Sequence, residues 1–274
     1  MNSAWFFDRS LYPLYIAFLL FLLNFIWKKK RALNIIGTIF TWLSFLMITG
    51  GFGLRWFEGM EVGNKYFPVT NLYESLVFMV WAVEGILLFF KHSRFKTDGI
   101  DFITLIICVG IMLWASTLEK EIKPLIPALQ SNWLSVHVIT SFIGYAAFAI
   151  GFSASIIHII KLKMPNFLPQ IETELFDTIN YKAVAFGFIM LTLGIVTGAA
   201  WANYAWGSYW SWDPKETWSL ITWLIYGVFL HGRLVAGWKG IKTSIISIIG
   251  FLAVLFTYLG VNLLLSGLHS YGGL

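Results

Sequence analysis

The residues best suited to chemistry in this sequence are two of its five histidines, His137 and His269. Neutral imidazole is a good axial ligand for haem iron. His137 lies four residues after Trp133, at the start of one apolar stretch, and His269 follows the end of the last one. The distribution of basic residues predicts that both ends face the same side of a membrane. Two imidazoles on separate helices are therefore candidates to bind one iron from opposite sides.

The other histidines occupy different positions. His231 lies thirteen residues after Trp218, which is about 20 Å along a helix. An ionisable group at that depth in a membrane is a functional-site hypothesis by default, and nearby Arg233 either extends towards water or pairs with a carboxylate. His158 is interpreted as a polar group satisfied within the helix bundle, and His92 as a solvated residue among basic neighbours.

Tryptophan is concentrated in one segment, with six of the 14 Trp between residues 201 and 223. The predicted loop Trp201–Trp218 includes Trp206, Trp210 and Trp212. One interpretation is an aromatic belt where the membrane meets water. The other is a platform for a flat, partly apolar ligand, because indole faces suit a large π-system and lose little conformational entropy on binding.

The end of this loop has the pattern of a helix start. Asp213, Pro214 and Glu216 have the spacing of the N-cap, N1 and N3 positions, which predicts a capping box. Capping explains Asp213 without a ligand, and no side chain is assigned as catalytic. Glu74 and Glu84 receive no role from the sequence.

The composition indicates a membrane protein, since 58% of the residues are hydrophobic and 12% are charged, against about 25% charged in soluble domains. Segments long enough to cross a bilayer recur along the chain. The predicted fold is an all-α polytopic membrane protein with about eight transmembrane helices, in Leu11–Trp27, Ala32–Leu54, Leu72–Phe90, Gly99–Thr117, Trp133–Ile160, Ala183–Ala200, Trp218–Leu230 and Thr243–Leu265. Residues 1–70 form a two-helix membrane segment with an outer loop, and residues 71–274 form the larger membrane domain, including the loop 201–218.

The basic residues predict the orientation. Thirteen of the 19 Lys and Arg fall in alternate loops, so the positive-inside rule places both termini and the tryptophan loop on the extracytoplasmic side. This distribution accounts for the net charge of +5 without nucleic acid. Within the inner loop Pro165–Asn180, helical spacing of apolar residues predicts an interfacial amphipathic helix. Cys108 is the single cysteine, which excludes a disulfide or a CxxC pair within the chain.

The segment Trp206–Trp218, followed by Leu220–Tyr226 and Leu230-His-Gly-Arg233, resembles the tryptophan-rich WWD domain of the CcsA/ResC family. These are haem-handling subunits of System II cytochrome c biogenesis. Asn71–Ser75, Trp133–His137 and Gly260–Tyr271 also match, so the resemblance extends from about residue 70 to the C-terminus.

The resemblance implies a haem-handling subunit of a cytochrome c synthase, or haem lyase, in a bacterial cytoplasmic or thylakoid membrane. It implies that His137 and His269 ligate haem b on the outer face, and that His231 receives haem from the inner side. A separate CcsB/ResB-type subunit is the expected partner, and apocytochromes c with a CxxCH segment are the expected substrates. Trp206, Trp210, Trp212 and Arg233 complete the predicted haem-binding set.

Two other functions remain open from the residues. A cytochrome b-like electron-transfer protein would use His158 as much as His231, and it has no need for the tryptophan loop. A haem exporter would move haem without affecting covalent attachment.

Overall fold

The computed structural model describes residues 2–27, 31–93, 97, 99–169, 171–265 and 267. These residues form helices joined by short connections, and no strand occurs among them. The chain divides into two compact units, residues 1–135 and 136–274.

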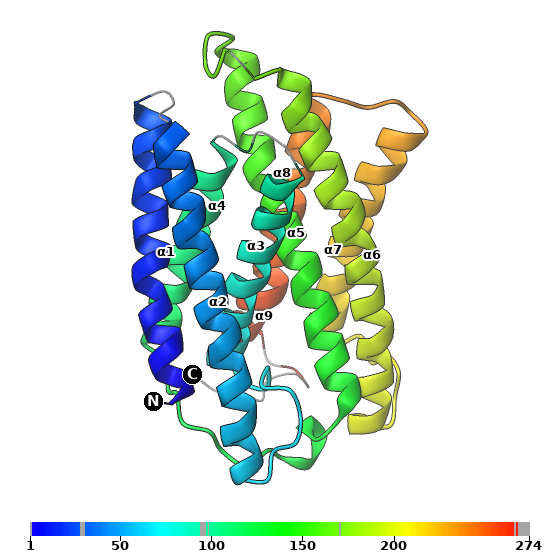
Figure 1. The fold of residues 1–274 in the computed structure, drawn as a ribbon. Coiled ribbons are helices and arrows are strands. Elements are labelled where there is room, and N and C mark those ends of the chain that lie inside the picture. The colour runs from blue at the N-terminus through cyan, green and yellow to red at the C-terminus, as the bar shows by residue number, and fades with distance from the viewer. Residues whose placement is uncertain are drawn as a thin grey trace. The chain divides into compact units, whose positions relative to one another are not determined.

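The first unit contains four long helices, α1 (Ser3–Ile26), α2 (Arg31–Glu61), α3 (Leu72–His92) and α4 (Ile100–Ser116). The helix α1 packs along α2 and also against α4, while α3 packs against α2 and α4 (Figure 1). Asn71 caps α3 because its side-chain oxygen accepts a hydrogen bond from the Glu74 backbone N–H, at 2.9 Å. A short 3₁₀ turn, η1 (Pro127–Leu129), precedes α5.

The second unit contains most of α5 (Asn132–Lys163), then α6 (Thr173–Trp206), α7 (Pro214–Leu234) and α8 (Ile241–Leu255). The last helix continues through a π-helical turn, η2 (Phe256–Gly260), into α9 (Val261–Leu264). The core of the second unit is built on Tyr226 of α7, whose ring stacks on Phe148 of α5 with centroids 3.6 Å apart. Gly250 leaves room for α8 to approach the same tyrosine ring.

Six of the described helices are long and apolar enough to cross a membrane, namely α1, α2, α3, α5, α6 and the continuous helix Ile241–Leu264. The apolar helix α4 is shorter, and α7 is not one of the six. Each predicted segment overlaps one of these eight helical segments. The all-α polytopic membrane fold is thus confirmed, while the count of eight spans and the side of the termini stay predictions.

Two predicted boundaries were wrong. Residues 173–180 do not form a separate interfacial helix but the first turns of α6, and Phe176 and Ile179 are buried. The apolar spacing was correct, but these side chains pack inside the protein. The predicted loop Trp201–Trp218 is also shorter, because α6 extends through Trp206 and α7 begins at Pro214.

Candidate functional site

His137 is held where α5 and α6 approach closely. Gly194 and Gly198 lie on the α6 face that meets it, and a Cβ at Gly198 would lie 2.6 Å from His137 Nδ1. A Cβ at Gly194 would collide with the Ser141 hydroxyl. The spacing Gly194-x-x-x-Gly198 is the small-residue pattern that lets membrane helices pack backbone to backbone. The imidazole thus lies directly against α6.

One hydrogen bond determines which ring nitrogen of the neutral His137 imidazole carries the proton. His137 Nδ1 lies 2.7 Å from the carbonyl oxygen of Gly194. A carbonyl only accepts, so Nδ1 carries the proton and Nε2 keeps its lone pair. Histidines that ligate metals are commonly oriented by such a bond through the other nitrogen. Half-buried His137 is therefore held with the proton on Nδ1, and in the neutral imidazole the Nε2 lone pair is not used by this bond.

Two tryptophans extend this site along α6. Trp201, which is 3% exposed, stacks on His137 with ring centroids 6.1 Å apart and planes at 12°. Trp206 packs its edge on Trp201 at 4.9 Å. The three rings form a continuous aromatic row that ends where α6 ends. Trp201 was predicted to lie in the loop and was not among the predicted ligand-binding residues. The Gly194-x-x-x-Gly198 spacing, which predicts close packing of this part of α6, is the sequence signal for its contact with His137.

The connection between α6 and α7 is short and tightly bonded. Gly207 ends α6 with a left-handed φ of +78°, a conformation that glycine adopts without strain. The Glu216 carboxylate accepts hydrogen bonds from the backbone N–H groups of Ser211, at 2.8 Å, and Asp213, at 3.2 Å. Asp213 in turn caps α7. The predicted capping box is confirmed. Its Glu216 side chain also bonds the end of the loop to the first turn of α7.

This bonded loop presents a second aromatic pair. Trp210 and Trp212 meet edge to face, with centroids 5.7 Å apart. The Trp212 side chain is 69% exposed, and its φ of +59° is rare for a bulky residue. Strained backbone that displays an exposed ring is typical of binding sites.

The helix after the loop is braced against the last span. Lys215 donates to the side-chain oxygen of Asn262 in α9 at 3.0 Å, and burial lowers the Lys215 pKa to about 8. Trp218 packs on Phe256, the first residue of the π-helical turn, at 4.2 Å. Thr257 donates to the Trp218 carbonyl at 3.2 Å. Single π-turns are frequent at functional sites, and this one, between α8 and α9, packs against the first turns of α7.

The opposite end of α7 carries His231 and Arg233. The Arg233 guanidinium pairs with Asp177 of α6 at 2.5 Å, the second of the two outcomes expected for it. Asp177 also accepts from the Gly240 N–H at 3.2 Å and the Thr243 hydroxyl at 3.1 Å. This network joins α6, α7 and α8. Arg233 thus forms a structural ion pair with Asp177. Its role in haem binding stays a prediction.

The two histidines near this end differ in their surroundings. His158 is buried, and its Nδ1 lies 2.9 Å from the Ser244 hydroxyl of α8, so it is the satisfied polar group expected. His231 is exposed and makes no side-chain hydrogen bond to any residue in the described part of the chain. No contact between the two imidazoles is found there either.

The structure thus brings together some of the predicted ligand-binding residues. His137 meets Trp206 through Trp201, and Trp210 meets Trp212. His231 and Arg233 lie on the last turn of α7. His269 lies outside the described residues. Among those residues, no group of three or more His, Cys, Asp or Glu side chains is arranged to hold a metal ion.

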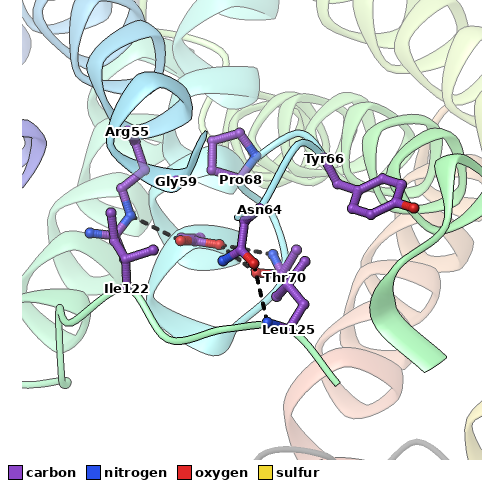
Figure 2. Close-up of a pocket in the computed structure, with 9 residues that line it drawn as sticks. Arg55, Gly59, Asn64, Tyr66, Pro68, Thr70, Ile122 and Leu125 are labelled. Carbon is purple, nitrogen blue, oxygen red and sulfur yellow. Dashed lines mark hydrogen bonds and ion pairs between the residues drawn. The ribbon is translucent and has the colours of Figure 1, made fainter. Parts of the chain in front are cut away.

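The first unit holds a separate polar pocket around Arg55 and Glu74 (Figure 2). Arg55 Nε donates to Glu74 at 2.9 Å, and Nη1 donates to the Lys120 carbonyl at 2.7 Å. The other Glu74 oxygen accepts from the N–H and hydroxyl of Thr70, at 2.9 and 3.0 Å. The sequence assigned no role to Glu74. In the structure its carboxylate links the start of α3 to Arg55 of α2 and to Thr70 just before α3.

These observations define a class of protein, a polytopic helical membrane protein with an oriented histidine in an aromatic-rich site. The model of the family described as cytochrome c assembly protein matches residues 69–269. "Cytochrome c biogenesis protein CcsA" of Mesostigma viride is 37% identical, with 97% of this chain and 95% of that protein covered. The protein of the same name from Microcystis aeruginosa is 38% identical, with 83% and 84% covered.

The chain therefore belongs to the CcsA family of cytochrome c biogenesis proteins. A Chlamydomonas reinhardtii CcsA is 45% identical over 76% of this chain, and the match spans 62% of that relative. Among solved structures, "Cytochrome c Heme Lyase CcmF" has the same fold, with a TM-score of 0.75 at 16% identity. That match covers 94% of this chain and 47% of CcmF, so the chain spans about half the length of CcmF.

Proposed function

We propose that this protein holds haem at the extracytoplasmic membrane face and presents it for covalent attachment to apocytochromes c. The observation that carries the proposal is the state of His137. Its Nδ1 is bonded to Gly194, so Nε2 is available to iron, and its ring stacks on Trp201. An oriented imidazole beside a row of indoles suits an iron porphyrin better than a bare metal ion.

The remaining ligands in the proposal come from the loop and the C-terminus. His269 would supply the second axial imidazole, as the family resemblance implies. Trp206, Trp210 and the exposed Trp212 would contact the macrocycle. His231 would receive haem on its way from the inner side. Its exposed position suits a second histidine from another subunit, since no described residue of this chain bonds it.

The proposed setting follows from the relatives and the charge pattern. Cyanobacterial and algal CcsA proteins match this chain, which supports a bacterial cytoplasmic or thylakoid membrane with both termini extracytoplasmic. CcmF, which shares the fold, is named a haem lyase. We propose the same activity here, exerted together with a CcsB/ResB-type subunit.

The chain's own contribution to the reaction would be positioning. Haem supplies the iron and two vinyl groups, and each cysteine thiol of a CxxCH segment adds across one vinyl, sulfur to one carbon and hydrogen to the other. His137 would fix the iron, and the tryptophans would fix the macrocycle plane. Holding both reactants in register can remove several kcal/mol of a barrier. Release would follow when the substrate's own histidine replaces one protein imidazole.

The test is the optical spectrum of the protein co-purified with its partner. The wild type is expected to show a bis-histidine haem spectrum that is lost in a His137→Ala/His269→Ala double variant. His92→Ala is the matched control, because that exposed histidine lies in the other unit. Retention of the spectrum in the double variant would refute the ligand assignment.

A haem stain of denaturing gels tests the reaction itself. A deletion strain is expected to lose all covalent c-type haem and keep b-type haem. Normal c-type signal with impaired haem movement would favour an exporter. Equal loss of activity in His158→Ala and His231→Ala would favour a two-haem electron-transfer protein, although the bond from His158 to Ser244 supports a structural role for His158.

A further inference from the structure

A second glutamate on α3 stands in contrast to the paired Glu74. Glu84 follows it by ten residues, about 15 Å along the helix. Its side chain is completely buried in the first unit. Neither carboxyl oxygen has a hydrogen-bond partner among the residues that the structure describes. Glu84 thus lies in the middle of a predicted membrane span. Unlike Glu74, which pairs with Arg55, it has no basic partner among the described residues.

Polar groups from both helices packed against α3 face this carboxyl. The hydroxyl of buried Ser44 in α2 approaches the Glu84 carboxyl. As the two side chains stand, this hydroxyl forms no hydrogen bond with the carboxyl or with any other residue in the described part of the chain. From α4, Cys108 is completely buried and lies within electrostatic reach of Glu84. Two cations of the same unit are already paired with other carboxylates, Arg55 with Glu74 and Lys91 with Asp101.

An ionised carboxylate has no source of stabilisation in these surroundings. Transfer of an isolated charge into a medium of low dielectric costs several kcal/mol even after relaxation, and such a group takes up a proton instead. A protonated carboxyl has one O–H donor, which a side-chain rotation would direct at the Ser44 hydroxyl. Buried acids in membrane helices that do not pair commonly bind protons or ions.

We propose that Glu84 is a proton-binding site within the membrane, with the Ser44 hydroxyl as its hydrogen-bond partner. The ligand is a proton, and the residues of the site belong to the first unit, whereas the histidine and tryptophan site belongs to the second. In the resting protein Glu84 carries its proton and is neutral. Glu74, ten residues away on the same helix, is the counterpart that is paired with Arg55.

The experiment uses dicyclohexylcarbodiimide, an apolar reagent that adds to protonated carboxyls within membranes. The wild-type protein in native membranes is treated over a range of pH, digested and mapped by mass spectrometry. Addition of the carboxyl to the carbodiimide leaves a stable acylurea adduct that is the sum of both molecules. We expect the adduct on Glu84 and not on Glu74, and we expect labelling to fall at high pH. Beyond the midpoint, each pH unit lowers the neutral fraction about tenfold.

Two variants sharpen the result. Glu84→Gln is expected to abolish the adduct on α3, and Ser44→Ala is expected to keep it, because the proton resides on the carboxyl. The wild-type map decides the matter even if either variant fails to fold. Absence of a Glu84 adduct at every pH would overturn the proposal. Protection of Glu84 by sodium at constant pH would also overturn it and would indicate a cation site instead.

Discussion

The two ends of the second unit use the same residue types in opposite ways. Where α5 begins and α6 ends, His137 is tied to a backbone carbonyl and stacked on an indole, with one ring nitrogen left available. Where α6 begins and α7 ends, His158 is tied to Ser244, Arg233 is tied to Asp177, and His231 is exposed.

The difference shows how each end is stabilised. The end with His137 depends on ring packing and a glycine contact. Its polar bonds orient the imidazole, close the loop and brace α7 against the last helix, and no ion pair is found there among the described residues. The other end depends on a mostly buried ion pair that also secures the start of α8. A substitution at the first end should therefore affect ligand binding more than stability, and one at the second end should do the reverse.

The largest effect is expected from Gly198→Ala, because the new Cβ would lie within 2.7 Å of the His137 ring. The imidazole must move, and a misplacement of about 1 Å can lower a rate on the order of 100-fold. Covalent c-type haem formation should fall steeply, and the haem spectrum should weaken, while unfolding changes little.

The matched control for this substitution is Gly227→Ala in α7, where the nearest atom lies 3.9 Å from the new Cβ. Its haem spectrum should match that of the wild type. A normal spectrum in Gly198→Ala would show that the close contact with α6 does not orient His137.

The second-largest effect, a loss of stability, is expected from Asp177→Asn. Removal of one partner from a buried pair costs about 3–5 kcal/mol, and the Arg233 and Asp177 side chains are only 13% and 9% exposed. Unfolding by denaturing detergent, followed by tryptophan fluorescence, should shift strongly to lower concentration.

Glu174→Gln is the control for Asp177→Asn, because this exposed carboxylate lies one turn earlier on the same helix. The variant should unfold like the wild type. If Asp177→Asn instead left stability unchanged and removed the haem spectrum, the ion pair would belong to the ligand site and the contrast between the two ends would be wrong.

The sequence predicted the parts of this structure that depend on local rules. Hydropathy located the helices, and the spacing of Asp213, Pro214 and Glu216 predicted the capping box, because both depend on residues near one another in the chain. Contacts between distant residues were not predictable in this way. The partner of Arg233 lies 56 positions earlier at Asp177, and Glu172 and Glu174 of the same inner loop were equally plausible from the sequence.

The same limit applies to the candidate site. Histidine and tryptophan types suggested the chemistry of His137, but its tautomer depends on the carbonyl of Gly194, 57 residues away. The misassigned helix at residues 173–180 has a related cause. An apolar stripe predicts a buried face, but it does not distinguish a membrane surface from the interior of a protein.

A smaller effect is expected from Glu216→Gln, which weakens the acceptor that closes the tryptophan loop. Loss of a charged acceptor at a helix start costs about 1 kcal/mol. The main change should be a looser loop, seen as faster quenching of tryptophan fluorescence. Ser208→Ala removes only one exposed hydrogen bond, to the Trp210 carbonyl, and should have less effect. An unchanged quenching rate in Glu216→Gln would show that the loop is held by ring packing instead.

The smallest effect is expected from Glu119→Gln, which removes the exposed ion pair with Lys123 in the first unit. The two side chains are 64% and 60% exposed although their charged atoms are only 2.7 Å apart. The hydrogen bond and charge of Lys123 lower the Glu119 pKa, so any stabilisation exists above the ordinary pKa and is lost as the pH falls through the lowered one. Water and salt screen such pairs, and detergent unfolding of variant and wild type should coincide at neutral pH. A wild-type stability that dropped with added salt, while the variant's did not, would show that this exposed pair contributes as the buried Asp177–Arg233 pair does.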